Sequence, residues 1–151
     1  MRKSEVDATS EFAASVLVNR RVEDVWRFIS DPMNAAVWGR GVSDIVVTSS
    51  EPVGLGSTLT LSMSGSKMGA RIFRFEAGQT LTLEFTSGPV KGTKLTYSVE
   101  SIGGNTRLAT DLEMRLNGVW KIMYPVLTRR RIRDREWGIA NVKRILEADL
   151  G

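Results

Sequence analysis

Apolar and polar residues alternate through the middle of the chain, which is the pattern of half-buried β-strands. At residues 58–63, for example, Leu59, Leu61 and Met63 alternate with threonine and serine. Stretches that favour turns, such as Gly103-Gly104-Asn105, separate one alternating segment from the next. The pattern predicts seven strands, at residues 12–18, 45–47, 58–63, 69–75, 81–85, 95–99 and 108–114.

Two short segments between the first and second predicted strands have helical spacing instead. At residues 22–29, acidic residues occupy the first turn and the apolar residues share one side. Asp31 followed by Pro32 is typical of a helix cap and a first helical position. We therefore expect a second short helix from Pro32 through Val37, with Trp38 at its end.

The last third of the chain, from Asn117 to the end, predicts one long helix. Two apolar stripes recur there at helical spacing, but they do not join in register because Thr128 and three arginines separate them. Pro125 removes a backbone donor just before this polar stretch and predicts a bend in the axis. The stripes consist of Trp120, Met123, Tyr124 and Leu127, then Ile132, Ile139, Val142 and Leu146.

The order of these elements predicts an α+β fold. One strand, two short helices, six hairpin-connected strands and a long helix suit an antiparallel sheet with one apolar face, curved around the final helix. At 151 residues the chain is long enough to bury the core of one domain. We expect that domain at residues 10–151, after a flexible tail at residues 1–9.

Composition excludes several kinds of chemistry. The sequence has no cysteine and no histidine, so it offers no disulfide, thiolate nucleophile, histidine base or histidine zinc ligand. It shows no signal peptide and no apolar run that could span a bilayer, and we expect a cytoplasmic protein. The net charge of +4 comes largely from arginines at residues 129–135. We interpret them as a solvated helix face and not as a nucleic-acid site, because no aromatic stacking set accompanies them.

Several short motifs occur in a recognisable order. They are VEDVWRFISDP around Trp26, Trp38 itself, Gly54-Leu55-Gly56, GGNTRL from Gly103, and LEAD near the end of the last helix. With these motifs the chain resembles the START-like, or helix-grip (SRPBCC), superfamily, and most nearly its bacterial polyketide cyclase/dehydrase-like branch. The resemblance implies a START-like ligand-binding domain, with a deep cavity between the concave sheet and the C-terminal helix where hydrophobic small molecules bind.

Geometry also favours a cavity, because one long and two short helices do not fill the trough of a curved seven-stranded sheet. The alternative is that bulky inward side chains fill the trough. For Trp38, packing at the end of the sheet is favoured over stacking on a ligand, and for Trp120 the two roles are evenly balanced. The candidate ligand-binding residues are Trp38, Leu61, Met63, Arg71, Phe73, Phe85, Tyr97, Leu112, Trp120, Tyr124 and Leu127.

The fourth predicted strand brings an arginine to the inner face in either register. The register that turns its phenylalanines, including Phe73, inward brings Arg71 with them, and the opposite register brings Arg74. We prefer the first because it buries more aromatic area. Arg71 would then bind an anionic group of the ligand, with Tyr97 as a second hydrogen-bonding group. The alternative is a rim arginine paired with a surface acid such as Glu84.

These features predict binding of a hydrophobic small molecule, for sequestration or transport. A cyclase or aromatase activity is the alternative, in which Arg71 and Tyr97 polarise a carbonyl of a shaped substrate. Catalytic residues stay unassigned, because Glu84, Asp111 and Glu113 all fall on the outer face. A second alternative is a protein-interaction module that uses the basic helix. No carboxylate cluster or phosphate loop predicts a metal or a cofactor, and monomer and dimer are both left open.

Overall fold

The computed structural model describes residues 7–8, 13–39, 41–50, 52–63, 65–88, 90–113 and 124–148, and for residues 7–8 and 124–135 it describes the backbone. The described elements, in chain order, are β1 (Asp7–Ala8), β2 (Ala13–Val18), α1 (Val22–Ile29), the 3-10 helix η1 (Pro32–Asn34), α2 (Ala35–Trp38), β3 (Val42–Val47), β4 (Thr58–Met63), β5 (Ser66–Glu76), β6 (Thr80–Phe85), β7 (Lys94–Ile102), β8 (Asn105–Glu113) and α3 (Tyr124–Ala148).

The strands form one antiparallel sheet in the order β1-β2-β8-β7-β6-β5-β4-β3. Strands β3 to β8 are hairpin neighbours, as predicted, while β2 pairs with β8. The β7–β8 turn uses Gly103 and Gly104, whose φ angles of 53° and 90° suit a two-residue hairpin loop. The short β1 pairs with β2 and adds an eighth strand within the predicted tail.

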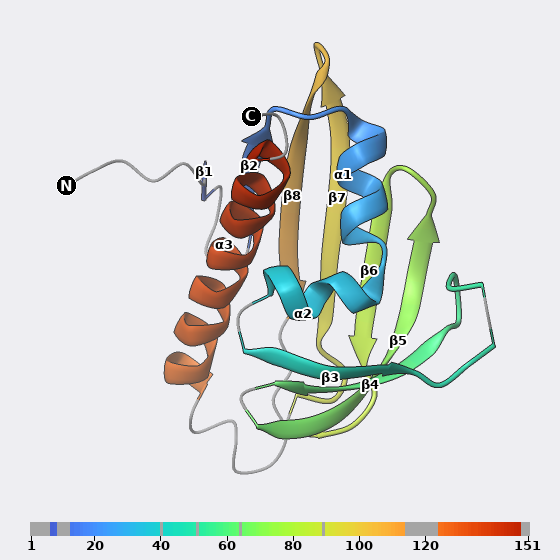
Figure 1. Cartoon of the computed structure of the whole chain (residues 1–151). Helices are drawn as coiled ribbons and strands as arrows, with labels where there is room; N and C mark the ends of the chain where they lie inside the picture. Colours follow the sequence, from blue (N-terminus) through green and yellow to red (C-terminus); the bar gives the residue numbers. More distant parts are fainter. Residues whose placement is uncertain are drawn as a thin grey trace.

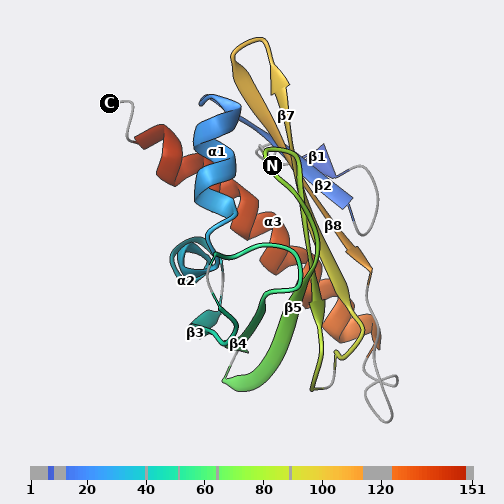
Figure 2. The same ribbon diagram turned by 90° about the vertical axis from the view of Figure 1, so that its right-hand side faces the viewer.

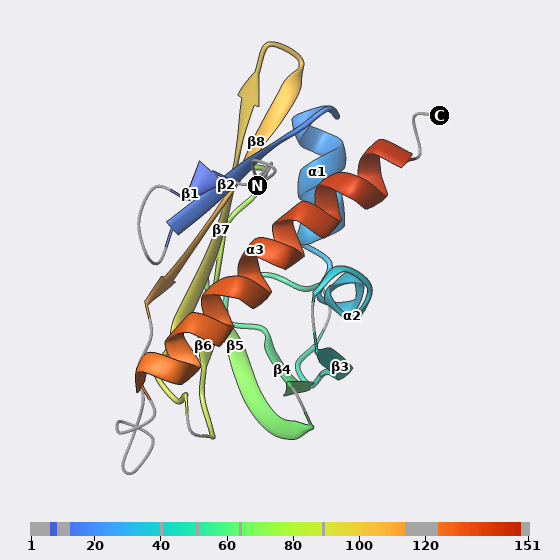
Figure 3. The same cartoon turned by 90° about the vertical axis from the view of Figure 1, so that its left-hand side faces the viewer.

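The helices lie on the concave side of this sheet (Figure 1). Helix α3 packs on β2 and β8, and α1 packs on β7 and β8. Figures 2 and 3 show α3 running diagonally across the sheet, with β3 and β4 bending round beneath α2. The predicted α+β fold, a curved sheet around a C-terminal helix, is confirmed.

The short helices form where the sequence predicts them. Helix α1 buries Val25 and Ile29. The side chain of Asp31 accepts a hydrogen bond from the backbone N–H of Met33 at 3.0 Å, and Pro32 follows it as the first residue of η1. η1 runs directly into α2, which ends at Trp38 and so places this aromatic ring over the sheet.

Helix α3 confirms most of its second predicted stripe, because Ile139, Val142 and Leu146 are buried. The predicted start at Asn117, the side chains of the first stripe and that of Ile132 fall outside the described residues. Pro125 is the second residue of α3 as described, and the bend predicted there stays a prediction because the residues before Tyr124 lie outside the described part of the chain. Among the described helices, none is both long and apolar enough to cross a membrane.

Most of the buried apolar residues in the described part of the chain form two separate clusters. The first, here called the helix-side cluster, joins the helices to β2, β7 and β8, and the second, the strand-side cluster, joins β3 to β6. The helix-side cluster contains Ala14, Val16, Val18, Val25, Ile29, Trp38, Tyr97, Val99, Leu108, Ile139, Val142 and Leu146. The strand-side cluster contains Ile45, Leu59, Leu61, Met68, Ala70, Phe85 and Val90.

The C-terminal end of α3 is tied to the segment that follows β2. The carboxylate of Glu147 accepts hydrogen bonds from Lys143 Nζ and from the backbone N–H of Asn19, both at 2.7 Å. Arg20 donates to the carbonyl oxygen of Leu146 at 2.9 Å. Burial by itself raises the pKa of Glu147, but the two hydrogen bonds and the charge of Lys143 outweigh it, so this pKa lies below its ordinary value.

Replacing Glu147 should make stability less dependent on acid pH. Glu147→Gln should lower the free energy of unfolding by about 0.5–1 kcal/mol near neutral pH, because the charge-assisted contacts are lost. A carboxyl group whose pKa is lower in the folded state than in the unfolded state stabilises the fold at pH values above the unfolded-state pKa. This stabilisation is lost as the pH falls through the folded-state pKa. Urea unfolding at about pH 7 and about pH 3 should therefore show a difference only at the higher pH.

Glu100→Gln is the matched control, because Glu100 pairs with Arg107 on the surface with both side chains more than half exposed. It should change stability less at both pH values. A loss in Glu147→Gln that is equally large in acid would contradict the assignment.

Candidate functional site: an apolar cavity

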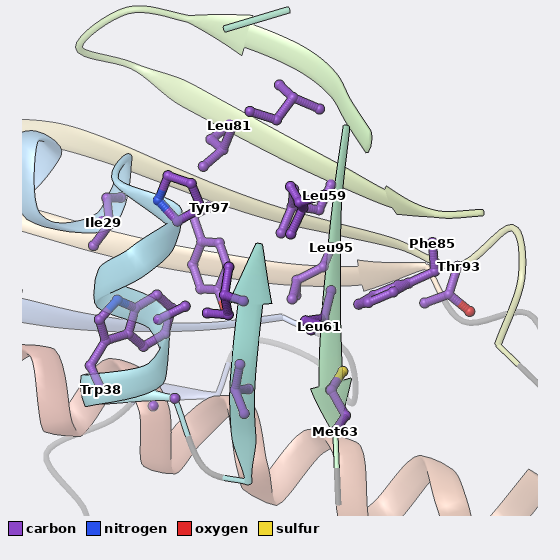
Figure 4. A pocket seen from close by; sticks show the side chains of 18 of the residues that line it. Ile29, Trp38, Leu59, Leu61, Met63, Leu81, Phe85, Thr93, Leu95 and Tyr97 are labelled. Carbon is purple, nitrogen blue, oxygen red and sulfur yellow. The ribbon is translucent and has the colours of Figure 1, made fainter. Parts of the chain in front are cut away.

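A cavity of about 120 Å³ lies between the concave face of the sheet and the helices. Cavities of roughly 150 Å³ are large enough to take up one benzene ring. Figure 4 shows side chains from strands and from the α1–α2 segment converging on this space. Its described wall consists of Ile29, Ser30, Pro32, Ala35, Trp38, Gly39, Val42, Ile45, Leu59, Leu61, Met63, Ile72, Leu81, Leu83, Phe85, Val90, Thr93, Leu95, Tyr97, Leu112 and Gly138.

The cavity lies where the two core clusters fail to meet. Ala35 and Leu95 both line it, and both pack against the helix-side cluster and the strand-side cluster. Figure 4 shows Trp38 and Tyr97 toward one end and Phe85 toward the other. Space thus remains beside the small side chain of Ala35, although Leu61, Phe85 and Tyr97 point into this part of the trough. Trp120 and the side chain of Leu127, two of the bulky groups that were expected to fill the trough, lie outside the described residues.

The described wall carries a few polar groups and no charged side chain. The polar groups are the hydroxyls of Ser30, Thr93 and Tyr97 and the indole N–H of Trp38. Tyr97 is the one ionisable residue in the described wall, and its ring meets that of Trp38 edge to face, with centroids 5.3 Å apart. Such a wall suits a molecule that is apolar and uncharged where it touches these residues.

A β-bulge in β5 keeps both candidate arginines out of the cavity. Ile72 pairs with Leu83 of β6, but Arg74 pairs with the next residue of β6, so Phe73 is an extra residue without a partner in the ladder. Ile72 faces inward before the bulge, and Phe75 meets Trp26 of α1 after it. The preferred register, with Phe73 and Arg71 inward, was therefore wrong, because the strand changes its alternation between them and Phe75.

Arg71 instead lies on the outer face of the sheet. Its Nε donates to Glu84 Oε1 at 2.6 Å, and its side chain is 48% exposed. The ring of Phe73 lies beside it on this face, with the guanidinium carbon of Arg71 5.5 Å and Nζ of Lys94 4.2 Å from the ring centroid. The alternative interpretation, an arginine paired with Glu84, describes what is found.

Arg71→Leu should leave ligand binding unchanged. The substitution removes an exposed ion pair and one cation–π contact, so it should also change the free energy of unfolding by less than about 1 kcal/mol. Isothermal titration with any ligand that the wild-type protein binds tests the first expectation. Arg107→Leu, which breaks a similarly exposed pair with Glu100, is the matched control. A tenfold loss of affinity in Arg71→Leu, with no loss in Arg107→Leu, would mean that Arg71 contacts the ligand after all.

Helix α3 fixes the position of Trp38. Asn141, which is buried, donates from Nδ2 to the carbonyl oxygen of Trp38 at 3.1 Å, and Arg144 donates to Oδ1 of Asn141. Gly138 provides room for the indole, since a Cβ at this position would lie 3.2 Å from Cζ3 of Trp38. The six-membered edge of the indole therefore rests directly on the α3 backbone, which no sequence pattern indicated.

The structure sorts the predicted site residues into three groups. Arg71 and Phe73 lie outside the cavity, Trp120 lies outside the described residues, and so do the side chains of Tyr124 and Leu127. The predicted residues on the cavity wall are Trp38, Leu61, Met63, Phe85, Tyr97 and Leu112. That they bind a ligand stays a prediction.

Apart from Trp38, sequence reasoning missed the wall that comes from α1, η1, α2 and β3. Ile29, Ala35 and Val42 line the cavity there. The available signal was modest, namely apolar residues at the ends of two short helices just before the period changes from helical to strand-like. Only the folding of this segment over the sheet brings them to the cavity.

A curved antiparallel sheet, a C-terminal helix across its concave face and an apolar cavity between them define a protein of the helix-grip class. Residues 9–150 match the family described as polyketide cyclase / dehydrase and lipid transport, and the chain belongs to this family. The resemblance seen in the sequence motifs is thereby confirmed. A search of curated proteins found no match.

Solved structures share this fold at low sequence identity. TTHA0849 from Thermus thermophilus is 14% identical with a TM-score of 0.70, over 93% of this chain and 99% of that one. XoxI from Bacillus cereus is also 14% identical, with a TM-score of 0.69 over 88% and 92% of the two chains. DynU16, a protein of the dynemicin biosynthetic locus, is 16% identical with a TM-score of 0.62, over 96% of this chain and 48% of that one. At these identities the likeness establishes the fold alone.

Proposed function

We propose that this protein binds a hydrophobic small molecule in its cavity, for sequestration or transport. The observation that carries the proposal is the apolar gap between two packed core clusters. At roughly 24 cal/mol per Å³, an empty space of about 120 Å³ costs about 3 kcal/mol. That is a large part of a net stability of about 5–15 kcal/mol, and one larger side chain at Ala35 would remove part of this cost. A ligand that occupies the gap accounts for its retention.

The ligand that fits the described wall is uncharged where it is enclosed. A carboxylate placed among these apolar side chains would lose its hydration without a cation in the described wall to replace it. The proposal therefore no longer includes the anionic group that the inward register of Arg71 had suggested. A ligand with a charged end would need to keep that end outside this wall.

The cyclase alternative has weaker support. The family description includes cyclases and dehydrases, and DynU16 comes from a biosynthetic locus. The pair of residues expected to polarise a carbonyl is separated, however, because Tyr97 faces the cavity and Arg71 the outer face. The interaction-module alternative depends on arginine side chains outside the described residues.

Native mass spectrometry of the purified protein, followed by denaturing mass spectrometry of what it releases, tests the proposal. We expect one apolar molecule per chain, or, if none is carried, a rise in melting temperature on adding apolar compounds of about one ring or a fatty acid whose chain enters the cavity. Failure of both would overturn the binding function. The identity of a released compound would also show whether a cyclisation is chemically available to it.

A further inference from the structure

The indole N–H of Trp38 is a buried donor without a partner among the described residues. Trp38 lines the cavity and is 5% exposed, and its Nε1 has no hydrogen-bond acceptor in the described structure. A buried indole N–H ordinarily finds an acceptor, and one left without a partner carries its full desolvation penalty. Thr110 Oγ1 is the other unpartnered buried side-chain atom of the described chain, but Thr110 does not belong to the cavity wall.

The position of Trp38 favours a role toward the cavity. Gly138 and Asn141 hold its ring and its carbonyl against α3. Figure 4 shows the indole nitrogen on the edge of the ring that faces away from α3, on the side of Ile29, which also lines the cavity. The contacts with α3 therefore fix the indole in place, and its N–H lies on the edge of the ring opposite α3.

We propose that Trp38 Nε1 donates a hydrogen bond to an uncharged oxygen of the ligand, of the ketone or ester class. The proposal rests on the binding function above and specifies its ligand. A neutral donor in an apolar wall matches a carbonyl oxygen, whereas a carboxylate would need a cation, and the described wall has no charged side chain. Less than 1 Å² of Nε1 is exposed, so the oxygen reaches it when the indole or a neighbouring side chain shifts slightly on binding.

Two matched compounds of one ring each test this inference. Acetophenone carries a ketone, and α-methylstyrene replaces that oxygen with a methylene group of similar shape. In ¹H–¹⁵N spectra of the wild-type protein, acetophenone should move the Trp38 indole proton downfield and α-methylstyrene should not. The chain has four tryptophans, and the signal missing from Trp38→Phe identifies Trp38.

Affinity provides a second readout. Trp38→Phe removes the donor and keeps an aromatic ring, so acetophenone should lose about five- to tenfold more affinity than α-methylstyrene. The comparison of the two losses matters, because the space left by the smaller ring affects both compounds alike. The spectra of the wild-type protein test the inference even if the variant does not fold.

The outcomes separate the two proposals. If both compounds bind, lose affinity equally in Trp38→Phe and leave the Trp38 indole proton unmoved, the cavity binds ligands but the donor role is overturned. If neither compound binds the wild-type protein, binding of ring compounds in this cavity fails and the donor role fails with it.

Discussion

Ala35→Phe should abolish ligand binding while leaving the protein folded. Ala35 lines the cavity and packs against both core clusters, so an added phenyl ring enters the gap between them. The affinity for any ligand enclosed there should fall by about 100-fold or more. The cavity has room for about one aromatic ring, and the new side chain would fill most of it. The melting temperature should stay level or rise, because filling a void recovers part of the roughly 3 kcal/mol that it costs.

The measurement is isothermal titration together with thermal unfolding. Val37→Phe is the matched control, because Val37 lies two residues further along α2 and is 61% exposed. It adds the same ring to the outer side of the helix and should leave affinity within about twofold. Undiminished binding by a folded Ala35→Phe protein would place the ligand elsewhere.

Leu108→Ala should have the opposite profile, with stability lost and binding kept. Leu108 is fully buried on β8, opposite Val16 of β2 and Val99 of β7, and it does not line the cavity. Truncation removes close contacts on all sides and should lower the free energy of unfolding by about 3–5 kcal/mol. For a domain of this size the melting temperature should fall by roughly 6–15 °C.

Thermal and urea unfolding would measure this loss, with Leu55→Ala as the control. Leu55 is 71% exposed, so its truncation should change the free energy of unfolding by less than about 0.5 kcal/mol. Below its melting temperature the Leu108→Ala protein should still bind ligand with wild-type affinity. A small loss of stability would mean that the helix-side cluster is not packed as described.

The strand alternation was reliable until it met the bulge. Leu59, Leu61 and Met63 face the cavity as their spacing predicts, and so do Leu81, Leu83 and Phe85. In β5 the same argument required one arginine to face inward, because strict alternation allows no other result. A single extra residue, Phe73, changes the alternation and leaves both arginines on the outer face. Phe73 has an ordinary strand sequence on either side, so nothing local marked the bulge.

The sequence by itself determined the elements and their order. Local backbone preferences decide which segments become strands or helices, and the alternation of apolar residues shows these preferences in the sequence. The same holds for the helix cap at Asp31-Pro32 and for the two glycines of the β7–β8 turn. From the order of elements, the curved antiparallel sheet and the C-terminal helix followed.

Only the tertiary structure decided where the core is left open and which groups face that space. The cavity depends on how two clusters from distant parts of the chain meet around Ala35 and Leu95. The orientation of Trp38 depends on Gly138 and Asn141, about 100 positions later in the chain. Packing and hydrogen bonding between distant segments set these features, and a one-dimensional pattern of apolar and polar residues does not contain them.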